Sequence, residues 1–153
     1  MKKMQFKTEV NATAEKAYLT MLGVNDIALY QQWTAEFNPT STYEGSWEKG
    51  SKILFTGVSE DGKRGGMIAR VVENVSNQFV SLQHYGIVKD DEEVFEGPEV
   101  EKWTGAFENY TFQESHGKTT ITVEVDVMPE YLDYFEDTYP KALNKLKEII
   151  EQV

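Results

Sequence analysis

The chain has 153 residues, of which 40% are hydrophobic and 12% aromatic, so we expect a single domain over residues 1–153 with one buried core. Its 26 Asp and Glu outweigh 15 Lys and Arg, and the formal net charge is −11. That balance excludes the basic surface with which proteins bind nucleic acids or anionic membranes. The absence of cysteine excludes disulfides, thiolate nucleophiles and Cys-ligated zinc.

The N-terminal segment MKKMQFKTEV carries the lysines of a signal peptide but no apolar stretch after them. No apolar run elsewhere is long enough to span a bilayer. We therefore expect a cytoplasmic protein without membrane insertion. The two histidines of the chain, His84 and His116, offer little for a metal site, so we expect neither a metal nor a cofactor.

The first part of the chain predicts one strand and two short helices. Alternating apolar and polar residues indicate a strand over 5–10. Thr13 is a suitable N-cap for a helix that ends at Gly23. A second short helix begins after Asn25 or Asp26.

The middle of the chain predicts antiparallel strands, because glycines separate short alternating runs. The runs 52–56, 66–73 and 79–88 have the pattern of strands. Residues 60–63 and 75–78 have the composition of turns.

A hairpin and a long helix are predicted near the C-terminus. The acidic stretch 89–102 is typical of a solvated loop. Segments 105–113 and 118–127 form a hairpin in which the second strand has one polar face. From 130 to 153 apolar residues recur at helical spacing, and Pro140 should kink this helix or split it.

These elements predict an α+β fold rather than a doubly wound parallel sheet, because no alternation of strand and helix is present. An antiparallel sheet of about seven strands should wrap its apolar face around the apolar side of the C-terminal helix. A space lined by large aromatic side chains should lie between them.

Five segments carry a resemblance to a known family: 33–39, 44–55, 61–67, 103–110 and 139–147. In order and spacing they resemble the bacterial SRPBCC or START-like superfamily, in the branch related to the activator of the ninety-kilodalton heat-shock-protein ATPase. The resemblance covers nearly the whole chain. It implies a helix-grip fold with an apolar cavity between the sheet and the C-terminal helix. It does not imply one activity, because such folds serve as ligand carriers, hormone receptors, cyclases, hydrolases and cochaperone modules.

Two polar residues share the parity of apolar residues on their strands. His84 alternates with Val80 and Leu82, and Glu108 alternates with Tyr110. Both side chains are therefore expected to point into the cavity, where a His–Glu pair would be the only catalytic candidate or would orient a ligand. The alternatives are a purely structural pair, or a bulge that turns one of the two outward.

Aromatic residues are numerous for one small core. Ordinary packing accounts for any one of them, but as a group they favour a cavity, and tyrosine and tryptophan can orient a ligand through their polar tips. The expected ligand-binding residues are Trp33, Phe37, Trp47, Phe55, Met67, His84, Trp103, Glu108, Tyr110, Tyr131 and Phe135.

The sequence contains no phosphate-binding, calcium-binding or serine-hydrolase motif. The glycine-rich segment 62–66 lacks the spacing of a phosphate-binding loop and reads as a hairpin. The acidic run 90–93 lacks the ligand spacing of a calcium-binding loop. No Gly-x-Ser-x-Gly elbow supports a hydrolase triad.

The leading hypothesis is a protein that binds a small apolar or aromatic molecule under its C-terminal helix. The resemblance alone suggests a cochaperone-like activator of a heat-shock ATPase as an alternative. An enzyme such as a cyclase, dehydratase or hydrolase would use the same cavity, with His84 and Glu108 as acid and base. Whether the chain is a monomer or a homodimer is open.

Overall fold

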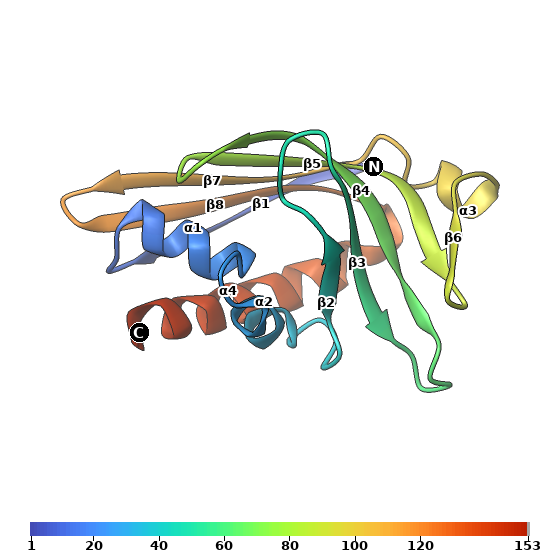
Figure 1. Cartoon of the computed structure of the whole chain (residues 1–153), viewed down its shortest axis with the longest axis horizontal. Helices are drawn as coiled ribbons and strands as arrows, with labels where there is room; N and C mark the ends of the chain where they lie inside the picture. The colour runs from blue at the N-terminus through green and yellow to red at the C-terminus, as the bar shows by residue number, and fades with distance from the viewer. Residues whose placement is uncertain (153) are drawn as a thin grey trace.

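One open antiparallel sheet of eight strands dominates the computed structural model, which describes residues 1–152 (Figure 1). Its order is β1-β8-β7-β5-β4-β3-β2, and β6 pairs with β5 away from this path. The strands are β1 (Lys2–Val10), β2 (Thr42–Gly45), β3 (Lys52–Val58), β4 (Arg64–Val75), β5 (Phe79–Lys89), β6 (Glu92–Val94), β7 (Phe107–Ser115) and β8 (Lys118–Val127). The predicted α+β helix-grip fold is confirmed.

The sheet curves around three helices that lie on one side of it, as Figure 1 shows. These are α1 (Ala14–Leu22), α2 (Ile27–Thr34) and the long α4 (Leu132–Gln152), which follows a 3-10 turn, η1 (Pro129–Tyr131). A further short helix, α3 (Pro98–Glu101), lies next to β6 at the end of the sheet that is far from α1 (Figure 1).

The short helices begin and end where capping chemistry predicts. The Thr13 side chain accepts a hydrogen bond from the backbone N–H of Lys16, and Asp26 accepts one from Ala28. Gly23 ends α1 in the left-handed conformation, with φ at 64°. A Cβ at that position would meet the Cβ of Tyr30 at 2.9 Å, so the close approach of α1 and α2 also requires glycine.

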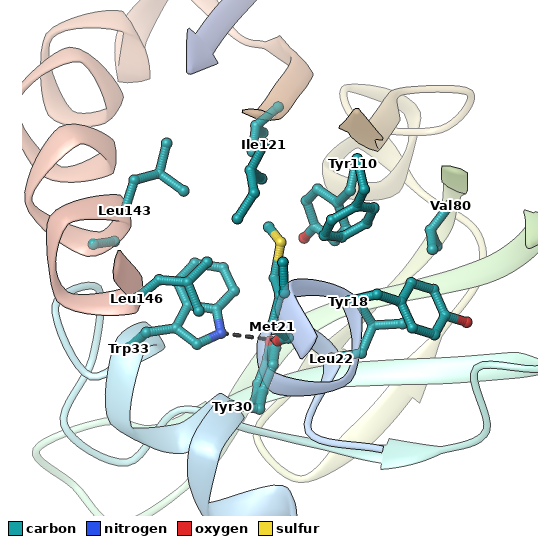
Figure 2. Close-up of a cluster of buried hydrophobic side chains, with 14 of the residues drawn as sticks. Tyr18, Met21, Leu22, Tyr30, Trp33, Val80, Tyr110, Ile121, Leu143 and Leu146 are labelled. Atoms are coloured by element: carbon teal, nitrogen blue, oxygen red, sulfur yellow. Dashed lines mark hydrogen bonds between the residues drawn. The ribbon is translucent and has the colours of Figure 1, made fainter. Parts of the chain in front are cut away.

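The core lies between the C-terminal half of α4, helix α1 and the sheet. Figure 2 shows Leu143 and Leu146 of α4 facing Met21 and Ile121 across this space. All four are almost fully buried. The indole Nε1 of Trp33 donates to the Met21 carbonyl at 2.9 Å, which ties α2 to α1.

One prediction near the C-terminal third is wrong. Residues 89–102 are not a plain solvated loop, because they contain β6 and α3 and bury Val100. Some of their acidic side chains are paired: Lys89 binds Glu99 at 2.8 Å, and Lys52 binds a glutamate of β6 at 2.7 Å. Backbone pairing of β6 with β5 and the burial of Val100 thus order a stretch whose composition indicated a loop.

Pro140 does not split the C-terminal helix. Helix α4 is continuous from Leu132 to Gln152 and contains Pro140. Tyr139 and Leu143, on either side of the proline, are both buried against the same core, and this packing offsets the backbone hydrogen bond that proline cannot donate. The predicted last residue of the helix, Val153, lies outside the described residues.

Candidate functional site

A cavity of about 250 Å³ lies between the sheet and helices α2 and α4. Most of the residues expected to bind a ligand line it: Trp33, Phe37, Phe55, Met67, His84, Trp103, Glu108, Tyr110 and Phe135. They come from helices, strands and connecting segments that are far apart in the sequence. The curvature of the sheet therefore brings them together, as the helix-grip architecture requires.

Two of the expected residues do not line this cavity. Trp47 is buried behind the cavity wall, where its ring centroid lies 5.3 Å from that of Tyr43 and 5.7 Å from that of the lining residue Phe55. Tyr131 is 42% exposed and packs on Trp103, with 5.5 Å between ring centroids. Both positions depend on how loops and η1 pack, which strand parity does not predict.

Glu108 holds its carboxylate inside the cavity from β7. The Tyr139 hydroxyl donates to Glu108 Oε2 at 2.8 Å. The Glu108 side chain is partly accessible, since it lines the cavity. Desolvation raises the pKa of the Glu108 carboxyl, and hydrogen bonds from Tyr139 and Tyr110 only partly oppose that rise.

Charge on Glu108 also acts on its tyrosine neighbours. The pKa values of the Tyr110 and Tyr139 hydroxyls are raised, chiefly by burial and next by repulsion from Glu108. Both hydroxyls therefore keep their protons at neutral pH and can donate to the carboxylate. The result is an enclosed carboxylate held by neutral tyrosines rather than by a cation.

His84 lies on β5 with 8% of its surface exposed, and it lines the same cavity. Its Nδ1 has no hydrogen-bond partner within residues 1–152. Burial lowers the pKa of the imidazole to about 4, although the negative charge of Asp126 acts in the opposite direction. At neutral pH the ring is therefore uncharged, and one of its nitrogens is a hydrogen-bond acceptor.

The predicted His–Glu pair is not formed, although both residues face the cavity. No hydrogen bond joins them, because Glu108 is paired with Tyr139 instead. A register shift does interrupt the pairing of β4 and β5, where Tyr85 is an extra residue between His84 and Gly86. The shift follows His84, so His84 keeps the inward parity of Leu82.

Five further residues line the cavity that were not expected as ligand contacts: Tyr30, Thr34, Ser41, Asp126 and Tyr139. For Tyr30 and Thr34 the helical spacing was a usable signal, because residues four apart lie on the same face of a helix. Tyr139 likewise lies four residues after Phe135, which was expected. Asp126 had the parity of the wet face of β8, and its carboxylate binds Lys3 at 3.4 Å and accepts from the Phe107 N–H at 2.9 Å.

Several alternative site types find no support among residues 1–152. No cluster of three or more His, Asp or Glu side chains that could hold a metal ion occurs there. The glycine-rich segment 62–66 lies in the β3–β4 hairpin. No helix in the described part of the chain is long and apolar enough to cross a membrane.

No protein-family profile and no curated protein matches this chain. Solved structures do. The Aha1 dimer from Colwellia psychrerythraea is 20% identical with a TM-score of 0.69, and the match covers 99% of this chain and 97% of that one. A protein from Mesorhizobium loti is 10% identical with a TM-score of 0.69, over 99% and 98% of the two chains. A protein from Arthrobacter aurescens is 11% identical with a TM-score of 0.70, over 99% and 87%.

The TM-scores establish the fold, and the low sequence identities leave the activity open. They agree with the resemblance noted from the sequence and confirm the architecture that it implied.

Proposed function

We propose that this protein binds a small, largely apolar molecule in the cavity between its sheet and helix α4. The supporting observation is an aromatic-lined cavity that also encloses two polar groups, Glu108 and His84. Binding sites for small molecules commonly combine a mainly apolar lining with a few placed polar groups.

The volume limits the size of the molecule. A cavity of about 150 Å³ is large enough for benzene. About 250 Å³ therefore suits one aromatic ring with a short side chain, or an apolar body of similar size. A long-chain lipid would need the aromatic side chains at the cavity mouth to move.

Tryptophan fluorescence tests the proposal, because Trp33 and Trp103 line the cavity and Trp47 does not. Titration with small aromatic compounds should change the fluorescence saturably, and a Trp47→Phe variant should keep that change. Native mass spectrometry of protein purified from its own host would reveal the mass of a retained molecule.

A pair of matched variants localises the binding. Ser41→Phe adds a ring at a residue that lines the cavity and should weaken binding at least tenfold. Ser115→Phe adds the same ring at an exposed residue of the β7 end and should not. If no compound changes the fluorescence and only the unliganded mass is found, the proposal is wrong.

A second candidate function comes from the likeness to the Aha1 dimer. It is the stimulation of a heat-shock ATPase, through the outer surface rather than the cavity, and that likeness also motivates a homodimer. An ATPase assay with the chaperone of the same host tests it. Absence of stimulation at micromolar concentrations would remove this candidate without affecting the first.

A further inference from the structure

The charged side chains that line the cavity are both acidic. Glu108 and Asp126 line it, and no Lys or Arg does within residues 1–152. Asp126 is compensated, because it binds Lys3 and accepts from a backbone N–H. Glu108 has tyrosine hydroxyls as its partners and no cation. Among the described residues that line the cavity, Glu108 is therefore the one acidic group without a cationic partner.

An uncompensated carboxylate restricts the ligand. A carboxylate or phosphate ligand would place a second negative charge beside Glu108, and none of the lining residues within 1–152 is a cation that could pair with it, which is unfavourable in a partly desolvated site. The whole chain, with a net charge of −11, repels anions and attracts cations as well. Fatty acids and other organic acids are therefore poor candidates.

Several polar atoms that line the cavity can accept hydrogen bonds from a cationic group. The Glu108 carboxylate accepts, the oxygens of Tyr139 and Tyr110 retain lone pairs, and neutral His84 has an acceptor nitrogen. His84 Nδ1 has no hydrogen-bond partner among residues 1–152. An ammonium group has three donors and no acceptor, so it matches this set.

Aromatic rings complete the match. Phe37 lies 5.0 Å from Tyr139 between ring centroids, and Trp33, Trp103 and Phe135 line the same cavity. The faces of such rings attract cations, and they pack equally well against an apolar body.

We propose that the ligand is a small organic amine, with its protonated amino group paired to Glu108 and its aromatic or other apolar body enclosed by the rings of the cavity. This inference rests on the proposed function and specifies the ligand class. An uncharged alcohol would donate one hydrogen bond to the same carboxylate but would leave its charge uncompensated.

Three probes of nearly equal size test the charge preference: 2-phenylethylamine, 2-phenylethanol and 3-phenylpropionate. Titrations at pH 7 follow tryptophan fluorescence, with calorimetry as a second readout. We expect the amine to bind at least tenfold more tightly than the alcohol, and the carboxylate to bind most weakly. Increasing salt should reduce the advantage of the amine.

Two variants assign the preference to one residue. Glu108→Gln keeps an oxygen that accepts from Tyr139 and removes the charge, so the amine should lose its advantage over the alcohol. Glu124→Gln makes the same change on β8 at a residue that does not line the cavity, and it should keep the advantage. Circular dichroism checks that both variants fold.

The outcomes separate this inference from the proposed function. If the alcohol binds as tightly as the amine, or the carboxylate binds best, the cavity binds ligands but the amine inference is wrong. An unchanged preference in a folded Glu108→Gln variant also overturns it. If none of the probes and no other small aromatic compound binds, both proposals fail. The comparison of probes on the unaltered protein decides the question even if a variant does not fold.

Discussion

Replacing His84 should change how the stability of this protein depends on pH. The imidazole pKa is about 4 in the folded protein and 6.5 in its ordinary state. Between these values the unfolded chain binds a proton that the folded protein does not, so the free energy of unfolding falls as the pH falls from 6.5 to 4. Above pH 6.5 the ring is neutral in both states, and its contribution is constant.

The size of the effect follows from the two pKa values. Each pH unit between 6.5 and 4 is worth about 1.4 kcal/mol, so the loss across the window is about 3 kcal/mol. His84 is only 8% exposed, so solvent screens little of this energy. Asp126 is the charged neighbour that opposes the loss. The other acidic residue at the cavity, Glu108, titrates in the opposite direction.

Urea denaturation at pH 4, 5, 6 and 7 measures this loss in the unaltered protein and in a His84→Phe variant. The variant should lose about 3 kcal/mol less than the unaltered protein between pH 7 and pH 4. His116→Asn is the control, since His116 is exposed on the β7–β8 turn with φ at 54°, a conformation that asparagine tolerates. Parallel stability curves for His84→Phe and the unaltered protein would refute the reasoning.

Three further substitutions have expected effects on urea denaturation. Glu108→Gln should stabilise the protein at pH 7–8. The pKa of the Glu108 carboxyl is raised by folding, so the unaltered protein loses stability as the pH rises, and glutamine does not titrate. A gain in stability that persists at pH 3 would contradict this. Gly66→Ala should prevent stable folding, because the added Cβ would lie 1.9 Å from a backbone oxygen of β3. In the control Gly62→Ala the added Cβ meets no atom within 4 Å, and the variant should lose only about 1–2 kcal/mol through backbone strain. Leu146→Ala should lower the free energy of unfolding by about 2–5 kcal/mol, because Leu146 is fully buried. Lys145→Ala, at the exposed neighbouring residue, should change it by no more than about 0.5 kcal/mol. Equal effects of the two variants would contradict the packing of α4 against the core.

Periodicity predicted the elements whose apolar residues all face one neighbour. The strand β7 and the helix α4 are of this kind, and their alternation or helical spacing matches the burial that the structure shows. On β8 the predicted wet face is wrong, because Thr122 is buried and Asp126 is half-buried. Elements stabilised by local backbone pairing were missed. Strand β2 has four residues and β6 has three, and both depend on a longer neighbouring strand rather than on a pattern of their own.

Parity predicted which side of the sheet His84 and Glu108 face, but not what each would contact. The partner of Glu108 depends on how far α4 lies along the sheet and how it is rotated, which places the Tyr139 hydroxyl at 2.8 Å. A sequence that carries two plausible partners, His84 and Tyr139, does not distinguish them. Trp47 shows the same limit, since loop packing directs it into the cluster with Tyr43 and away from the cavity.

The composition of α4 changes along its length, and this change accounts for the position of the cavity. In the C-terminal half, Leu143, Leu146 and Ile150 are flexible aliphatic side chains that are buried in the main core. In the N-terminal half, Phe135 and Tyr139 present rigid rings that meet Phe37 at ring-centroid distances of 6.1 and 5.0 Å. Flat rings packed edge to face do not fill a concave sheet completely.

The polar groups of the cavity oppose two outcomes, namely collapse of the sheet onto the helices and a dry, empty cavity. A dry cavity of 250 Å³ would cost about 6 kcal/mol at about 24 cal/mol per Å³, which is comparable to the whole stability of a small domain. Closing the sheet onto Glu108 and His84 would instead bury a carboxylate and an unpartnered imidazole, which is also costly. A polar lining lets water occupy the space at lower cost. A ligand that replaced this water would have to satisfy the same acceptors, so under the proposed function the polar groups, rather than the aromatic rings, would determine which molecule binds.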